Sequence, residues 1–559
     1  MSDDAAWWRS AVVYQVYPRS FADSDGDGTG DLRGVLSRLD HLVALGVDVL
    51  WLSPVYPSPQ HDNGYDISDY QDVDPVFGTL ADLDELIAAL HARGMRLLMD
   101  LVVNHTSDEH SWFRASRSSK DDPKRDWYWW RPPRPGTTPG APGSEPTDWG
   151  SFFSGPAWTF DEATGEHYLH LFTCQQPDLN WENPEVRRAV HEMMRWWLDR
   201  GVDGFRMDVI NMISKDPALP DGVVRRPGGQ GDGTPHFLGG PRLHEYLQEM
   251  HREVFEGREG LLTVGEMPGV TVEQAALFTD PARRELDMVF QFEHVDVDHG
   301  ASKWDVLPFD LRLLKASLGR WQEGLAESGW NSLYWNNHDQ PRVVSRFGDD
   351  GVHRVRSATA LGTVLHLHRG TPFVYQGEEL GMTNTPFRDI SELQDVESLN
   401  HWRDAVAAGQ DPEQVLAGLR AMSRDNARTP MQWDSGPHAG FTTGEPWLAV
   451  GPDHVEVNAE AARADPDSVF HHYRRLIALR HNEPVVAHGD FTMLLPDDPQ
   501  VYAFTRRLHD VELLVVANLS GEPATLDLPL DGEVLLTNLP GSTGPALEPW
   551  EARVLRRRR

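Results

Sequence analysis

Eight short apolar runs, separated by longer helical patterns over roughly the first 480 residues, constrain the fold of this chain more than any other feature. Short apolar runs that alternate with helical patterns are typical of βα units, whose strands lie parallel in one sheet. The candidate strands are 12–17, 47–52, 96–102, 204–209, 261–266, 288–292, 332–336 and 372–376. Eight such units predict an α/β fold, specifically a (β/α)8 TIM barrel.

Capping residues predict where some of the intervening helices begin and end. Thr79 and Asp82 have the spacing of a capping box and precede a helical apolar pattern. Asn183 followed by Pro184 predicts a second helix start, and Gly201 predicts the end of that helix. These helices are therefore expected to cover the barrel.

Two stretches depart from the βα pattern. The segment 104–172 is rich in Trp, Pro, Gly and Ser and predicts a small domain inserted after the third strand. The irregular stretch 377–440 follows the eighth strand, so both are expected over the carboxyl end of the barrel. Alternating apolar runs near the end of the chain predict an antiparallel β domain. The predicted domains are a discontinuous barrel (1–103 and 173–480), the insertion (104–172) and a C-terminal β domain (481–559).

Charge and cysteine content disfavour several classes of protein. The net charge of −35 opposes binding to nucleic acid or to an anionic membrane. Cys174 is the single cysteine, so no intramolecular disulfide can form, which fits a reducing compartment. No run of eighteen apolar residues predicts a membrane span, and residues 1–4 lack the features of a signal peptide. We expect a cytoplasmic protein with a neutral small-molecule partner, monomeric or alternatively a homodimer.

Carboxylates and polar residues gather where the predicted strands end. The third strand leads from Asp100 to His105, the fourth reaches Asp208, the fifth ends at Glu266, and the seventh leads to Asp339. Buried carboxylates behind apolar runs are costly unless they are paired or used. Because the carboxyl ends of the strands meet at one end of a barrel, we expect a single shared site.

Asp208 and Glu266 form a candidate pair for cleaving a glycosidic bond. Arg206 lies two residues before Asp208 on a strand, so both side chains leave the same face, and a guanidinium favours the ionised carboxylate. Glu266 has to stay protonated long enough to donate to a leaving oxygen. One carboxylate that forms a glycosyl ester and one that protonates the leaving group are what retaining glycoside cleavage needs.

Four motifs, in the same order as in a known family, carry a resemblance along the whole chain. They occupy residues 100–105, 204–209, 264–267 and 337–339. With them the chain resembles glycoside hydrolase family 13, the α-amylase family. Further stretches resemble its oligo-1,6-glucosidase, or isomaltase, group, and they occupy 176–180, 377–379 and 423–433. Together these motifs are highly specific.

The resemblance implies a role for each of the three acids. Asp208 would be the nucleophile, Glu266 the general acid/base and Asp339 the stabiliser of the transition state. It also implies a set of substrate-binding residues that clasp the non-reducing glucose in a blind pocket and shape the subsite of the leaving sugar. That set is Asp66, His105, Phe172, Gln176, Arg206, Val209, His338 and Arg424.

Val209 bears on which linkage is cleaved. In similar enzymes, valine directly after the nucleophile goes with α-1,6 linkages and threonine with α-1,4. We therefore expect hydrolysis of isomaltose, isomalto-oligosaccharides and panose. The enzymatic alternative is an α-1,4-glucosidase or sucrose hydrolase that also transfers glucose. An alternative from another class is a non-catalytic partner subunit, which is disfavoured because the catalytic residues are all present.

An acidic loop near the N-terminus predicts a metal site. Its spacing matches the first nine positions of a calcium loop, with the carbonyl of position seven among the ligands. The bidentate acid expected at position twelve is absent. The candidate ligands are Asp23, Asp25, Asp27, Thr29 and Asp31. We expect a structural Ca²⁺, with Mg²⁺ as the alternative, and no organic cofactor.

Overall fold

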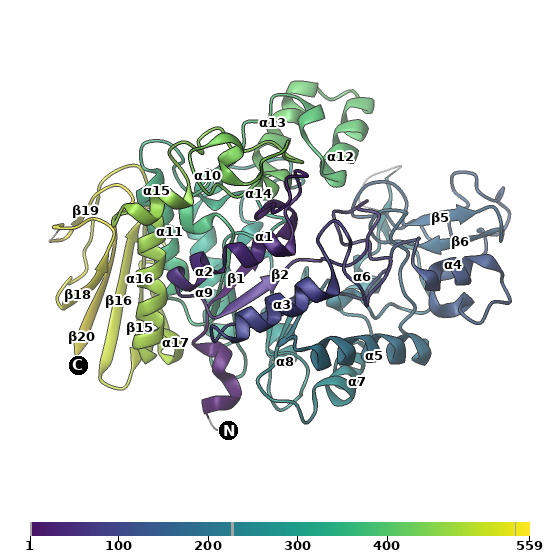
Figure 1. The fold of residues 1–559 in the computed structure, drawn as a ribbon, viewed down its shortest axis with the longest axis horizontal. Helices are drawn as coiled ribbons and strands as arrows, with labels where there is room; N and C mark the ends of the chain where they lie inside the picture. The colour runs from purple at the N-terminus through teal and green to yellow at the C-terminus, as the bar shows by residue number, and fades with distance from the viewer. Residues whose placement is uncertain (1–2, 225–228, 543, 559) are drawn as a thin grey trace.

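Eight parallel strands form the centre of the molecule. The computed structural model describes residues 3–224, 229–542 and 544–558 (Figure 1). The strands run in the order β11-β10-β7-β3-β2-β1-β13-β12, and a parallel bridge between Val289 and Asn331 joins the two ends. The barrel strands are β1 (Val13–Val16), β2 (Val49–Leu52), β3 (Arg96–Val102), β7 (Gly204–Asp208), β10 (Leu262–Glu266), β11 (Met288–Phe290), β12 (Ser332–Tyr334) and β13 (Thr371–Tyr375). The prediction of a TIM barrel is confirmed.

Helices cover the outside of the barrel, and their predicted caps are present. Thr79 and Asp82 form a capping box at the start of α3. Asn183 caps α5 with Pro184 in its first turn, and Gly201 ends that helix in a left-handed conformation. The outer helices include α1 (Leu32–Ser37), α2 (Leu39–Leu45), α3 (Leu80–His91), α5 (Pro184–Arg200), α7 (Leu243–Met250), α8 (Val272–Phe278), α9 (Leu311–Gly324), α11 (Arg354–His366) and α16 (Val469–Asn482).

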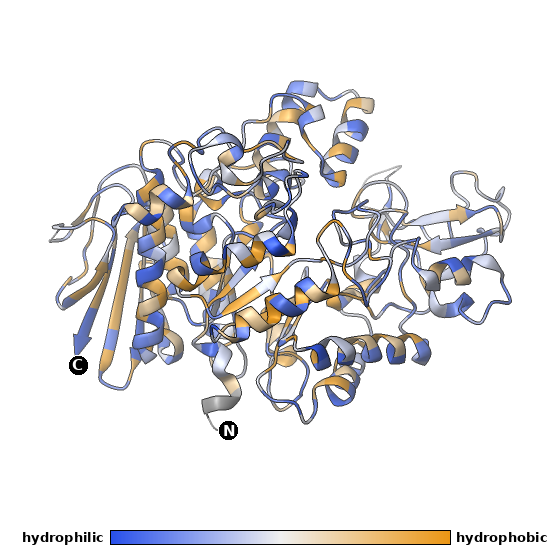
Figure 2. Ribbon diagram, viewed as in Figure 1, coloured by the Kyte–Doolittle hydropathy of each residue, from blue (hydrophilic) through white to orange (hydrophobic). Residues whose placement is uncertain are grey.

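Alternation along the barrel strands divides their side chains between two apolar layers. Val13 and Val49 lie in one buried cluster, whereas Tyr14 and Leu50, the next residue of each strand, lie in the larger cluster that includes buried residues of the outer helices. Figure 2 shows orange, hydrophobic runs on the central strands and on parts of the surrounding helices. Trp51 belongs to the first cluster, and its indole N–H donates to Asp100, so the core leads directly to the carboxylates.

The insertion after β3 folds into helix α4 (Ser111–Ser118) and a small antiparallel sheet. Its strands are β4 (Trp130–Arg131), β5 (Trp158–Asp161) and β6 (Glu166–Leu169), in the order β4-β6-β5. We call 104–172 the inserted domain; its sheet lies at the opposite end of the molecule from the C-terminal strands (Figure 1).

The stretch 377–440 holds a helical hairpin that the sequence analysis described only as irregular. Helices α12 (Val396–Ala407) and α13 (Pro412–Met422) are capped by Asp395 and Asp411. Their apolar residues pack with Trp304 in a small cluster of their own. The Asp-Pro start of α13 is a helix signal that the sequence contained.

The C-terminal sheet is antiparallel, as predicted. It begins at Asp490, after 481, because α16 and the short helix α17 (Pro484–His488) occupy the intervening residues. Its strands are β14 (Asp490–Leu494), β15 (Val501–Leu508), β16 (Val511–Asn518), β18 (Glu533–Thr537) and β20 (Ala552–Arg558). Among the described residues, no helix has the length and hydropathy needed to cross a membrane.

Lys215 ties the returning end of the insertion to the barrel. Its Nζ lies 2.8 Å from Asp178 Oδ2 and donates to Asn104 Oδ1 at 3.0 Å and to the Met212 carbonyl at 2.8 Å. The side chains of Lys215 and Asp178 are fully buried. Three oxygens thus surround the three protons of a buried ammonium.

We predict that Lys215→Met lowers the free energy of unfolding by about 3–5 kcal/mol, because Asp178 would keep a buried charge without its partner. The matched control is Lys120→Met, which removes an ion pair with Glu166 whose lysine is 52% exposed, and it should cost less than about 1 kcal/mol. Denaturant unfolding of the three proteins measures the difference. Equal losses in both variants would contradict the role of Lys215.

Candidate active site

Arg206 lies at the centre of the site and binds three carboxylates. Its Nη1 lies 2.6 Å from Asp100 Oδ1 and 2.7 Å from Asp208 Oδ1, and its Nη2 lies 2.8 Å from Glu266 Oε1. The arginine side chain is only 1% exposed. Strand register produces this meeting, since Arg206 on β7 is opposite Asp100 on β3 and Val264 on β10. One planar guanidinium therefore holds acids from three neighbouring strands.

Asp208 and Glu266 are close neighbours because they bind the two terminal nitrogens of the same guanidinium. Both residues end their strands, β7 and β10, and both side chains are almost completely buried. A retaining glycosidase needs two carboxyl groups about 5–5.5 Å apart, one on each side of the reacting carbon. The arrangement suits attack by one acid and proton donation by the other.

Burial has the largest effect on the pKa of Asp208 and on that of Asp100. Burial raises the pKa of Asp208 well above its ordinary value; Arg206 opposes this shift and Glu266 reinforces it. Arg206 thus acts in the expected direction, but burial outweighs it. Burial likewise raises the pKa of Asp100 to about 6 against the opposing effect of Arg206.

Asp339 has the opposite electrostatic environment. Its carboxylate lies 2.8 Å from Arg428 Nη2, 3.3 Å from Arg424 Nη1 and 3.3 Å from His338 Nε2. Burial alone would raise the pKa of Asp339, but His338 and the two arginines hold it well below the usual range. Asp339 therefore stays ionised beside the other two acids.

The two histidines of the site are neutral near pH 7. Burial lowers the pKa of His105 to about 4 and that of His338 to about 3. His338 stacks on the ring of Tyr65 and its Nδ1 lies 2.9 Å from Gln15 Nε2. Neutral imidazoles held in this way can exchange hydrogen bonds with hydroxyl groups.

Several of the predicted glucose-binding residues meet around an acid that the sequence analysis missed, Asp62. Its carboxylate accepts from Gln176 Nε2 at 3.0 Å and from Arg424 Nη2 at 3.1 Å. Gln176 also lies 3.2 Å from His105 Nε2, and the ring of Phe172 is in contact with that histidine. Gln176, Arg424, His105 and Phe172 are therefore brought together.

Asp66 lies outside this cluster. It is fully buried, and its carboxylate accepts from the backbone N–H groups of His61 and Asp62 and from the Ser58 hydroxyl. Both oxygens are therefore used to hold the turn that presents Asp62. The geometry favours Asp62 over Asp66 as a sugar ligand, and a local sequence pattern does not distinguish two acids on one turn.

Two more residues of the site were not singled out from the sequence. Asp395, the cap of α12, lies 2.6 Å from Arg424 Nη2, and Arg428 binds Asp339. Arg428 falls within the 423–433 stretch, so its motif already pointed to this region. The backbone N–H of Val209, the residue after Asp208, donates to Glu266 Oε2 at 3.0 Å.

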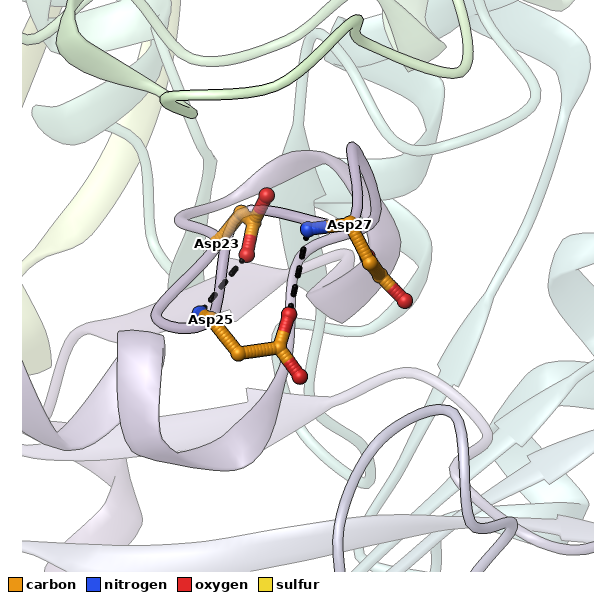
Figure 3. A group of neighbouring side chains, drawn as sticks. All are labelled: Asp23, Asp25 and Asp27. Carbon is orange, nitrogen blue, oxygen red and sulfur yellow. Dashed lines mark hydrogen bonds between the residues drawn. The ribbon is translucent and has the colours of Figure 1, made fainter.

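The acidic loop at 23–31 brings three of its four predicted carboxylate ligands together. Carboxylate oxygens of Asp23, Asp25 and Asp27 lie within 4.8 Å of one another, and Figure 3 shows them on one tight loop. Asp31 points elsewhere, since its carboxylate accepts from Ser24 and caps α1. Hard cations take such oxygen donors, so Asp23, Asp25 and Asp27 fit a divalent ion.

A closed (β/α)8 barrel with paired carboxylates at the carboxyl ends of its strands defines the class: a glycoside hydrolase. The alpha amylase catalytic domain matches residues 15–489, and the maltogenic amylase C-terminal domain matches residues 491–548. The chain belongs to the α-amylase family, glycoside hydrolase family 13.

Relatives match the chain over nearly its whole length. It is 54% identical to an oligo-1,6-glucosidase of Parageobacillus thermoglucosidasius, over 99% of each chain. It is 55% identical to an oligo-1,6-glucosidase of Halalkalibacterium halodurans, over 98% of each. The crystal structure of Bacillus licheniformis trehalose-6-phosphate hydrolase superposes with a TM-score of 0.91 at 47% identity, covering 98% of this chain and 99% of the other.

Glu378, directly after β13, supports the loop that carries Asp339. One of its oxygens accepts from Asn336 Nδ2 at 2.6 Å and the other from the Tyr473 hydroxyl at 2.9 Å. Asn336 in turn accepts from the backbone N–H of Val343 on the far side of the loop. Burial raises the pKa of Glu378 to about 7.

This pKa predicts a pH-dependent stability. A carboxyl whose pKa is higher in the folded than in the unfolded chain stabilises the fold at low pH, and this contribution is lost as pH rises through 7. Glu378→Gln removes the titration, so the variant should gain about 3 kcal/mol relative to the parent between pH 5 and pH 8. Unfolding of both proteins at the two pH values measures this gain, and a stability difference that does not change with pH would contradict it.

Proposed function

We propose that this enzyme is an exo-acting, retaining α-glucosidase that hydrolyses terminal α-1,6-glucosidic bonds of isomaltose, isomalto-oligosaccharides and panose. The observation that carries the proposal is the pairing of Asp208 and Glu266 on Arg206. The chain is also 54% and 55% identical to two oligo-1,6-glucosidases over nearly its whole length.

The reaction proceeds in two displacements. Asp208 attacks the anomeric carbon in its ionised form, which Arg206 favours against the effect of burial. Glu266 donates its proton to the glycosidic oxygen, so the bond to the leaving sugar breaks and a glucosyl ester forms. Water then attacks the same carbon, gives its proton to Glu266 and releases Asp208. Two inversions return glucose with its original anomeric configuration. Asp339, held ionised by its cations, stabilises the positive charge of the transition state.

Contacts around Asp62 support an exo action. Arg424 connects Asp62 with Asp395 at the start of α12, and Asn400 on α12 donates to the backbone carbonyl of Phe153 in the inserted domain. The hairpin and the inserted domain therefore meet beside the glucose-binding residues. We infer that this contact closes the site behind the non-reducing sugar.

Ion pairs near the site favour a neutral substrate over a phosphorylated one. The name of the similar trehalose-6-phosphate hydrolase indicates a phosphorylated substrate for that enzyme. The cations of this region already have carboxylate partners in the structure. These pairs are Lys303 with Glu397, Arg346 with Asp298, Arg424 with Asp395, and Arg428 with Asp339. A phosphate would have to compete with these acids, in a protein whose net charge is −35.

Two variants and a substrate panel test the proposal. We predict that Asp208→Asn and Glu266→Gln each lower kcat on isomaltose by at least about 10³-fold, because each removes one of the two chemical roles. The matched control is Asp84→Asn, an exposed acid paired with Arg200, which should retain the parent rate.

The parent enzyme should hydrolyse isomaltose faster than maltose or sucrose and release α-glucose first, as followed by NMR. Faster cleavage of maltose or sucrose would favour the alternative linkage preference. Initial release of β-glucose would contradict the retaining mechanism. Unchanged rates in Asp208→Asn would remove that residue from the chemistry.

We further propose that Asp23, Asp25 and Asp27 hold a structural Ca²⁺, or alternatively Mg²⁺. Three carboxylates on one loop repel one another, and a divalent cation would relieve this repulsion. Ca²⁺ should therefore raise the thermal midpoint of metal-free protein by several degrees, and Asp25→Asn should abolish most of that rise. A midpoint that does not respond to either ion would contradict the site. The single cysteine supports our proposal of a cytoplasmic protein, and we propose a monomer with a homodimer as the alternative.

A further inference from the structure

Val209 has an unusual backbone conformation for its residue type. It lies between Asp208 and the 3₁₀ helix η4 (Ile210–Met212), with φ 35° and ψ 42°, in the left-handed region. A β-branched residue is strained there, because its side chain crowds the backbone. Such strain persists only where surrounding structure imposes it, and it is concentrated at functional sites.

This conformation brings a hydrogen-bond donor to Glu266. The N–H of Val209 donates to Glu266 Oε2 at 3.0 Å, while Arg206 Nη2 binds Oε1 at 2.8 Å. Glu266 itself comes from β10, yet its carboxyl oxygens are bound by Arg206 on β7 and by Val209, the residue directly after β7. The orientation of one acid is thus fixed from the backbone that carries the other.

The inserted domain holds Val209 in place. Val209 is 7% exposed and belongs to an apolar cluster built largely from that domain, separate from the barrel layers. The cluster also contains Trp129, Trp149, Ala157, Trp158, Leu169, Leu171, Met212, Leu219 and Phe237. Because protein interiors are close-packed, this cluster restricts movement of the turn at Val209.

We infer that Val209 is a positioning residue for Glu266: the apolar core of the inserted domain holds the left-handed turn, and the turn's N–H orients the carboxyl that donates the proton. The inference rests on the proposed acid/base role of Glu266. The inserted domain then controls proton donation in addition to bordering the substrate. A substitution at Val209 changes the leaving-group step through the backbone, beyond any contact of its side chain with the leaving sugar.

Substrates with good and poor leaving groups distinguish a positioning role of Val209 from a role in packing alone. A poor leaving group, as in isomaltose or phenyl α-glucoside, needs a proton from Glu266, whereas 2,4-dinitrophenolate leaves 2,4-dinitrophenyl α-glucoside as a stable anion without one. A misplaced Glu266 therefore lowers kcat/KM selectively on poor leaving groups. A general loss of structure lowers kcat/KM on all substrates alike.

Two variants weaken the turn from different sides. Val209→Gly frees the backbone, and Leu169→Ala removes a buried side chain from the cluster without touching Glu266. Both should lower kcat/KM on phenyl α-glucoside by about tenfold or more and on the dinitrophenyl substrate by less than about threefold. Val209→Thr keeps the branched side chain, so the ratio of its kcat/KM values on the two aryl glucosides should equal that of the parent, whatever the threonine does to the preference for linkage. Leu514→Ala, an equally buried leucine of the C-terminal cluster, is the matched control and should show no selectivity.

Glu266→Ala separates this inference from the proposed function. If Glu266→Ala loses activity equally on good and poor leaving groups, the acid/base role itself fails. If Glu266→Ala is selective but Val209→Gly and Leu169→Ala are not, the role of Glu266 stands and the positioning inference is overturned. Selectivity in all three variants, with a parent-like Val209→Thr and a non-selective Leu514→Ala, is the result we expect.

Discussion

The ion pairs of Arg206 are the interaction on which the rest of the site depends. Three carboxylates from neighbouring strands would repel one another in a buried space, and each would be costly to ionise alone. One guanidinium, itself buried, contacts all three. The barrel makes this possible because it brings the ends of β3, β7 and β10 together. Without Arg206, these three buried carboxylates would lose the one cation that contacts all of them.

Segments outside the barrel also contribute residues to the site. Arg424 and Arg428 follow the hairpin of α12 and α13 and help to hold the pKa of Asp339 low. Burial, in contrast, raises the pKa of Asp208. The inserted domain is joined to the barrel by the buried Lys215 and by the apolar cluster around Val209. The pKa of Asp339 and the packing around Val209 therefore depend on segments outside the barrel.

Local patterns predicted the strands and drew attention to Asp208, Glu266 and Asp339, because each acid lies within or shortly after an apolar strand and a barrel brings the carboxyl ends of its strands together. Asp62 was missed in favour of Asp66, since only the folded turn decides which carboxylate accepts its N–H groups. Asp395 depends on a contact with the distant Arg424. The left-handed conformation of Val209 runs against the preference of a β-branched residue, so no propensity could predict it.

The most direct test of the account is to trap the glucosyl–enzyme ester and identify the modified residue. Incubation with a slow fluorosugar, such as 5-fluoro-α-glucosyl fluoride, followed by peptide mass spectrometry, locates the ester. The account predicts one glucosyl adduct per chain, on Asp208, and none in Asp208→Asn. An adduct on Glu266 or Asp339, or turnover that proceeds with inversion and no adduct, would contradict it.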